Sequence, residues 1–157
     1  MSEIEHYEIL VVGSGEANTQ GIGLETAGIE LDSRGYIKVN ERLETTAPGV
    51  WAMGDCAGSP QFTHVAFDDF RVVRDNLNGG SRTTRDRLVP FCMFTDSELA
   101  RVGLSESEAK KRGTAYRLAK IPMAAVLRAV AIGETRGFVK MLIDVQSDRK
   151  LGFTVFG

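Results

Sequence analysis

Between Thr45 and Gly58 the chain reads TTAPGVWAMGDCAG. The apolar run Val50–Met53 in its middle stops at a glycine and an acidic residue, which predicts a buried strand that ends in a turn. Gly54 can adopt backbone angles that other residues avoid, so it allows a sharp turn or the close approach of a ligand. Asp55 would then lie at the carboxyl end of the strand, where open α/β sheets bind ligands, and its carboxylate suits a ligand hydroxyl better than a phosphate. An Asx-turn or a helix N-cap is an equally good interpretation of Asp55.

The length and charge of the chain limit the kinds of protein it can be. It has 157 residues and a net charge of −2, which leaves room for one domain or two small ones. It carries no basic block, so neither nucleic acid nor an anionic membrane is expected as a partner. No apolar run approaches the roughly 20 residues of a membrane-spanning helix, and the acidic N-terminus lacks the features of a signal peptide, so we expect a cytoplasmic protein. Cys56 and Cys92 are far apart in sequence and are expected to be free thiols, and no catalytic or metal-binding residue is assigned.

The N-terminal residues begin like a dinucleotide-binding fold. Tyr7–Val12 predicts a strand, and Gly13 and Gly15 follow it in a glycine turn. In such a fold the turn opens a helix whose N-terminus receives a pyrophosphate, which makes both glycines candidates for cofactor binding. The third glycine of the fingerprint belongs at position 18, where the chain has Asn18, and no long amphipathic helix follows. Taken alone, the fingerprint is broken.

The clearest predicted helix covers residues 62–77 and is ended by Gly79 and Gly80. An apolar stripe forms its predicted core face: Ala66, Phe70, Val73 and Leu77. The acidic residues of the helix, Asp69 included, are assigned to the other faces. His64, near the helix start, is interpreted as structural or solvent-exposed.

Residues 81–86 are polar and predict a linker, after which the pattern changes. Ser105 and Glu108 predict a capping box for a helix over residues 106–112. Alternating patterns and turn residues predict the remaining elements. These are strands over residues 88–94 and 116–121, a connection or short strand over 128–135, and a hairpin of two strands over 138–145 and 151–156.

The first half also carries a long, ordered set of residues that is found in a known family. The set consists of Asn18-Thr19, Gly23-Leu24-Glu25, Ala27-Gly28, Gly35-Tyr36-Ile37-Lys38-Val39, Thr45 to Asp55, and His64-Val65-Ala66. It resembles the second FAD-binding segment of the pyridine nucleotide-disulfide oxidoreductases, which include dihydrolipoamide dehydrogenase, glutathione reductase and mercuric reductase. The resemblance implies that Asp55, in its pair with Gly54, holds a hydroxyl of the FAD ribityl chain, and that Ala66 lies near the isoalloxazine ring.

The second half resembles the C-terminal interface domain of the same family, and its most similar branch is that of mercuric reductase and dihydrolipoamide dehydrogenase. The matching residues are Val89-Pro90, Phe94-Thr95-Asp96, Glu98, Ala100 to Leu104, Glu108-Ala109, Arg128-Ala129, Gly133-Glu134-Thr135, Gly137 to Lys140 and Leu151-Gly152. In the family this domain builds a homodimer. The resemblance therefore implies a possible homodimer through the C-terminal half of this chain.

The family pattern is interrupted at Asn18. Residues 1–17 look like the opening of the FAD domain, and Asn18 onward looks like its far end, so we expect an internal deletion there and a truncation after Gly157. The redox-active cysteine pair, the NAD(P)H-binding domain and the C-terminal His–Glu pair of the family are not found in the sequence. FAD is the cofactor that the resemblance implies, NAD(P)H is expected only of full-length relatives, and enzymatic activity of the chain is left open.

The predicted fold class is α/β plus α+β. A remnant of an FAD-binding Rossmann-like domain is expected over residues 1–80, with its first strand and glycine loop in 1–17 and the second FAD segment in 18–80. A linker over 81–86 leads to a partial dimerisation domain over 87–157. The predicted function is that of an FAD-dependent NAD(P)H oxidoreductase of the disulfide reductase family, here a fragment without full activity. The alternative is a non-catalytic dimerisation module that pairs with itself or with a full-length sibling, helped by an exposed strand edge over residues 153–156.

Overall fold

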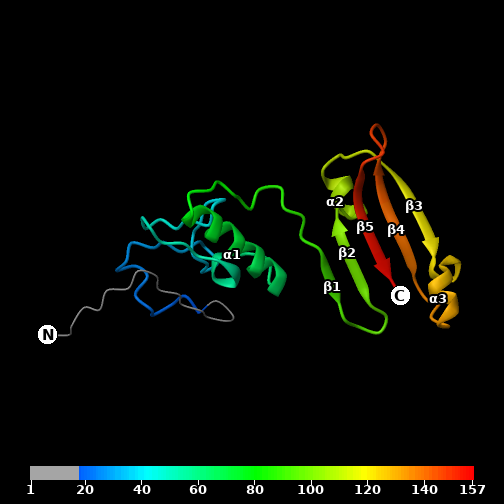
Figure 1. The fold of residues 1–157 in the computed structure, drawn as a ribbon, viewed down its shortest axis with the longest axis horizontal. Coiled ribbons are helices and arrows are strands. Elements are labelled where there is room, and N and C mark those ends of the chain that lie inside the picture. Colours follow the sequence, from blue (N-terminus) through cyan, green and yellow to red (C-terminus); the bar gives the residue numbers. More distant parts are fainter. Residues whose placement is uncertain (1–17) are drawn as a thin grey trace. The chain divides into compact units, whose positions relative to one another are not determined.

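The computed structural model describes residues 18–157, and the chain divides into two compact units (Figure 1). The first unit ends at Asp86 and the second begins at Arg87. The strand predicted over residues 7–12 lies outside the described residues. Within the described part, helices and strands are sparse in the first unit and dense in the second.

The described part of the first unit contains the 3₁₀ helix η1 (Gly54–Ala57), the helix α1 (Thr63–Leu77) and loops. Its extended loops form two isolated antiparallel bridges, one between Leu31 and Ile37 and one between Glu44 and Trp51. The strand predicted over residues 50–53 is therefore wrong. A strand needs a neighbour that pairs with its backbone over several residues, and within residues 18–157 each segment finds such a partner at one position.

Helix α1 begins at Thr63 and ends at Leu77, and Gly79 follows with a φ of 79°, so the predicted helix and its end are confirmed. Its predicted core face is wrong. The buried residues are Val65, Asp69 and Val72, whereas Phe70 is 40% exposed and Leu77 is 51% exposed. The buried residues also recur at spacings of four and three, so they form a helix face of their own beside the predicted one. The prediction passed over this face because a charged residue lies in its middle.

The second unit is built on a five-stranded antiparallel sheet in the order β1-β2-β5-β4-β3. The strands are β1 (Phe91–Met93), β2 (Leu99–Gly103), β3 (Tyr116–Pro122), β4 (Phe138–Asp144) and β5 (Lys150–Phe156). The hairpin of β4 and β5 and the strand β3 confirm the predictions within a residue or two. The strand expected over residues 88–94 is shorter, because only its last part pairs with β2.

The strand order places β5 in the middle of the sheet, where it pairs with β2 on one side and with β4 on the other. The prediction that residues 153–156 form an exposed strand edge is therefore wrong, because both edges of β5 are hydrogen-bonded. The edges of this sheet are β1 and β3 (Figure 1). The error arose because strand order depends on pairing between distant segments, which local alternation does not reveal.

Helix α2 (Glu106–Lys111) carries the predicted capping box: the hydroxyl of Ser105 accepts a hydrogen bond from the backbone N–H of Glu108, and the Glu108 side chain bonds back to the N–H of Ser105. The 3₁₀ helix η2 (Met123–Ala125) and the helix α3 (Leu127–Ala131) follow β3. The connection or short strand predicted over residues 128–135 is thus partly helical, because leucine, arginine and alanine favour a helix.

The two faces of the sheet differ in character. Helix α2 is tied to one face by ion pairs, Glu106 with Lys140 at 2.8 Å and Glu108 with Arg101 at 3.5 Å. Side chains alternate along a strand, so the residues next to Lys140 in β4 and next to Arg101 in β2 point to the opposite face. That face is apolar, and we call it the apolar sheet face: Ala100, Val102, Ala119, Ile121, Val139, Met141, Phe153 and Val155.

Candidate functional site

The turn at Gly54 is the centre of the candidate site. Gly54 has a φ of 73°, in the left-handed region, and it begins η1. Its backbone N–H donates a hydrogen bond of 2.8 Å to Oδ2 of Asp69, and this bond is buried. The expected sharp turn at Gly54 is confirmed.

Asp55 is the second residue of η1 and is half-buried. The N-cap of η1 is Met53, which makes no side-chain capping bond, so the N-cap interpretation of Asp55 is wrong. Within residues 18–157, no hydrogen bond or ion pair engages the Asp55 carboxylate. A carboxylate without such bonds can accept hydrogen bonds from the hydroxyl groups of a ligand.

Ala66 lies at the start of α1, directly against the turn. A methyl group built on Gly54 would lie 3.5 Å from the Cβ of Ala66, so the Ala66 side chain lies next to Gly54. Ala66 is half-buried, and its N–H donates to the carbonyl oxygen of Phe62 at 3.0 Å in the first turn of the helix. The structure thus brings Gly54, Asp55 and Ala66 together, whereas Gly13 and Gly15 lie outside the described residues.

Cys56 follows Asp55 and is a free thiol, as is Cys92 in the second unit, which confirms the prediction. The Cys56 Sγ donates to the carbonyl oxygen of Met53 at 3.3 Å. Burial, above all, raises the pKa of the Cys56 thiol, and the charge of Asp55 adds to the shift. A raised pKa keeps the thiol protonated near neutral pH, which is the inert form.

Backbone hydrogen bonds from two loops hold the segment that carries the turn. The N–H of Ala52 donates to the carbonyl of Leu43 at 3.0 Å, and the N–H of Ile37 donates to the carbonyl of Cys56 at 2.8 Å. Farther along, the ring of Tyr36 lies so close to Gly58 that an added Cβ would meet it at 3.2 Å. The turn is therefore supported on both sides of Asp55.

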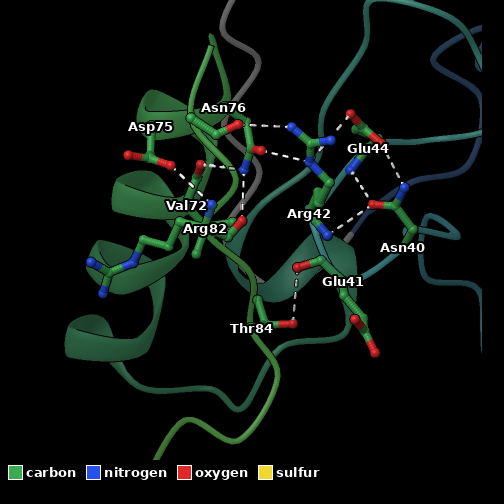
Figure 2. Close-up of polar contacts among 10 residues, drawn as sticks. Asn40, Glu41, Arg42, Glu44, Val72, Asp75, Asn76, Arg82 and Thr84 are labelled. Atoms are coloured by element: carbon green, nitrogen blue, oxygen red, sulfur yellow. Dashed lines mark hydrogen bonds and ion pairs between the residues drawn. The ribbon is translucent and has the colours of Figure 1, made fainter. Parts of the chain in front are cut away.

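A polar network fixes the far end of α1, as Figure 2 shows. The Nε of Arg42 donates to Oδ1 of Asn76 at 2.6 Å, and its Nη2 donates to the carbonyl of Gly80 at 3.0 Å. The side-chain amide of Asn76 donates to the carbonyls of Val72 and Arg82, each at 2.8 Å. The start of the predicted linker is thus bound back to the helix.

The same network continues to the end of the linker. The N–H of Thr84 donates to the carbonyl of Glu41 at 2.8 Å, and Arg85 forms an ion pair of 2.7 Å with the Glu41 side chain. Residues 40–44 therefore connect α1 to the segment that leads out of the first unit. This network was missed by sequence reasoning, because the bonds that Arg42 and Glu41 form join residues 34 to 44 positions apart.

Two further observations concern the remaining candidate residues. His64 is exposed and stacks on Phe62 with ring centroids 5.3 Å apart, in agreement with its interpretation as structural or solvent-exposed. Asp69, which sequence reasoning assigned to the surface, is fully buried at the turn. Among the described residues, no group of three or more His, Cys, Asp and Glu side chains is arranged to hold a metal ion. In the same part of the chain, no helix has the length and apolar character needed to cross a membrane.

Comparison with known proteins gives two family matches. Residues 2–69 match the model of the pyridine nucleotide-disulphide oxidoreductases, and residues 89–157 match the model of their dimerisation domain. The chain is 42% identical over 148 residues to the probable pyridine nucleotide-disulfide oxidoreductase RclA of Escherichia coli K12, and 41% identical over 155 residues to the dihydrolipoyl dehydrogenase of Thermus scotoductus. These alignments cover 92% and 99% of this chain but only 34% and 33% of the relatives.

A solved structure agrees with the sequence matches. The HOCl-induced flavoprotein disulfide reductase RclA from Escherichia coli is similar with a TM-score of 0.80 and 42% identity, over 87% of this chain and 32% of that chain. The predicted fold class, a partial FAD-binding domain followed by a dimerisation domain, is confirmed. The chain spans about a third of the length of the relatives it matches.

The alignments also bear on the deletion predicted at Asn18. The RclA alignment has 148 positions and takes in 92% of the 157 residues, about 144 residues, so it contains only a few gap positions. A large deletion within this chain would appear as a long gap, and the expected internal deletion is therefore not supported. The assignment of Gly13 and Gly15 to a pyrophosphate loop falls on residues that the structure does not describe, and it stays a prediction.

Three findings point to the same family: the Gly54–Asp55 turn beside Ala66, the antiparallel sheet of the second unit, and the matches over both halves. The relatives named above are oxidoreductases, and one is a flavoprotein by name. The chain belongs to the pyridine nucleotide-disulphide oxidoreductase family.

Proposed function

We propose that this chain supplies the second FAD-binding segment and the dimerisation unit of an FAD-dependent NAD(P)H oxidoreductase of the disulfide reductase kind. The observation that carries the proposal is the Gly54–Asp55 turn, which presents a half-buried carboxylate that no other residue of 18–157 engages, beside the start of α1. Bound FAD would supply the hydride chemistry of the family.

The residues at the turn suit a flavin with a ribityl chain. The Asp55 carboxylate accepts hydrogen bonds from ribityl hydroxyls, since it has no other partner within residues 18–157. Gly54 and Ala66 carry little or no side chain where the turn meets the helix, which allows a planar ring to approach the backbone. In this proposal Ala66 lies near the isoalloxazine ring and Gly54 shapes the turn.

The hydride-transfer and disulfide-reduction steps of the family require groups that this chain does not provide. Its two cysteines are at positions 56 and 92, so it has no pair of closely spaced thiols in sequence. We propose that the chain contributes flavin binding and dimerisation and that full activity, including the use of NAD(P)H, depends on other parts of a complete enzyme.

Replacing Asp55 with alanine is expected to weaken FAD binding about 10- to 100-fold, because a hydrogen bond to a charged group contributes about 1.5–3 kcal/mol. The measurement is the visible flavin absorption that remains after incubation of the whole chain with FAD and desalting, followed by titration of FAD fluorescence. Glu25→Ala is the matched control, since Glu25 is an exposed carboxylate of the same unit. Equal flavin retention by the Asp55 and Glu25 variants would contradict the assignment, and a colourless wild-type chain would contradict FAD binding itself.

A second function is favoured by the match to the dimerisation domain over residues 89–157. We propose that the second unit forms a homodimer, and the apolar sheet face supports this because monomeric proteins rarely expose a continuous apolar surface. The expected result in light scattering coupled to gel filtration is a mass of twice 17.1 kDa. Phe153→Glu places a charge on the apolar sheet face at a side chain that is 36% exposed, and it should shift the mass toward the monomer. A monomeric wild-type chain, or polydisperse aggregate, would contradict the proposal.

A further inference from the structure

We propose that Asp69 is a positioning residue for the flavin site: its buried carboxylate holds the Gly54 turn and thereby sets the direction of the Asp55 side chain. The inference deepens the proposed function and rests on it for the identity of the ligand. Asp69 itself does not need to touch the flavin.

The position of Asp69 in α1 is unusual for an acidic residue. It is fully buried, and it lies between Val65 and Val72 on the buried face of the helix. A buried acidic side chain is costly unless hydrogen bonds compensate for the loss of water. One such bond is the one of 2.8 Å that Oδ2 accepts from the N–H of Gly54.

The Gly54 N–H needs an acceptor that the local backbone does not give. Gly54 is the first residue of η1, and the first N–H groups of a helix have no partner within the helix. The left-handed φ of 73° at Gly54 ends the extended segment before it, so the Gly54 N–H does not continue the hydrogen-bonding direction of that segment. A side chain from α1 therefore satisfies a buried donor that would otherwise remain unpaired.

This bond links the two candidate flavin contacts mechanically. On one side it fixes the peptide plane of Gly54, which directly precedes Asp55. On the other side it anchors at Asp69, one helical turn beyond Ala66 in the same helix, and the Ala66 side chain lies next to Gly54. Because Val65 and Val72 are buried on either side of Asp69, α1 has little freedom to rotate away. Loss of the Asp69 carboxyl oxygen would thus allow Asp55 and Ala66 to move relative to each other.

The test compares Asp69→Leu, Asp69→Asn and Asp68→Leu in the whole chain. Leucine is similar in size and removes the acceptor, asparagine keeps a carbonyl oxygen at the same place, and Asp68 is the neighbouring half-buried carboxylate that pairs with Arg82 instead. Two readouts are needed: the FAD dissociation constant from fluorescence titration, and the hydrogen-exchange rate of the Gly54 amide from ¹⁵N NMR. The second readout does not require FAD.

We expect Asp69→Leu to speed exchange of the Gly54 amide at least 10-fold and to weaken FAD binding about 10- to 100-fold. Asp69→Asn should keep the Gly54 amide protected and hold FAD within about threefold of wild type, which a role limited to the charge of Asp69 would not produce. Asp68→Leu should change neither quantity. If Asp69→Leu does not fold, Asp69→Asn decides: loss of FAD binding with a protected Gly54 amide would overturn the proposal.

An unchanged Gly54 exchange rate in a folded Asp69→Leu variant would also overturn the proposal, as would FAD binding equal to that of Asp68→Leu. If the wild-type chain binds no FAD, the proposed function fails by itself. The exchange rate then decides separately whether Asp69 holds the turn.

Discussion

Replacing Leu142 with alanine is expected to lower the free energy of unfolding of the second unit by about 2–5 kcal/mol. Leu142 is 1% exposed and is the largest of the fully buried side chains among the described residues. It lies in the middle of β4, on the face that carries α2, so its removal leaves a cavity that the paired strands on both sides cannot easily close. Hydrogen exchange of the β4 and β5 peptides, followed by mass spectrometry, reports the local stability without assuming that both units unfold together.

Leu118→Ala is the matched control for this experiment. Leu118 is paired directly with Leu142 across β3 and β4, and it points to the same face, but it is 45% exposed. The same loss of atoms should there lower the free energy of unfolding by about 1 kcal/mol, in proportion to the apolar surface that is buried. If both variants were equally destabilised, the core of the second unit would not be centred on Leu142.

Gly137→Ala is the second substitution with a large expected effect. Gly137 precedes β4 with a φ of 104°, and an added Cβ would overlap the backbone carbonyl of Phe156. Backbone atoms in a paired strand cannot move aside as a flexible side chain can, so the pairing of Phe138 with Phe156 must open. The expected cost is about 1–2 kcal/mol for the backbone conformation and about 1–3 kcal/mol more for the overlap.

Gly133→Ala separates these two contributions. Gly133 also has a positive φ, of 76°, but nothing lies within 4 Å of the place where its Cβ would be. The positive φ destabilises both alanine variants, whereas the overlap destabilises only Gly137→Ala. Chemical denaturation followed by circular dichroism should therefore place Gly137→Ala below Gly133→Ala in stability, and the reverse order would contradict the described start of β4.

Local signals in the sequence were sufficient where an element is defined by neighbouring residues. Ser105 and Glu108 predicted the start of α2, and the turn residues between β4 and β5 predicted their hairpin. The position of α1 was predicted from the periodicity of its apolar residues and from the glycines after it. In each of these cases the interacting residues lie within a few positions of one another, so the local sequence was enough to identify them.

The errors concern features that distant partners determine. The buried face of α1 was misplaced because Asp69 is buried by a bond to Gly54, which is 15 residues away. The segments around Ile37 and Trp51 have the composition of strands, but each forms a single bridge within the described residues. Gly54, Asp55 and Ala66 came from a resemblance that spans a long segment, and the structure places them near one turn, while their role in cofactor binding stays a prediction. Asp69 was missed because its bond to Gly54 is visible only once the helix and the turn are placed together.

The most direct test of the flavin site is a titration of the ¹⁵N-labelled chain with FAD, followed by NMR. We expect the largest shifts at the amides of Gly54, Asp55 and Ala66, with saturation and with a smaller response from residues 87–157. An absence of saturable shifts at these three amides, or shifts confined to the second unit, would contradict the proposed flavin site.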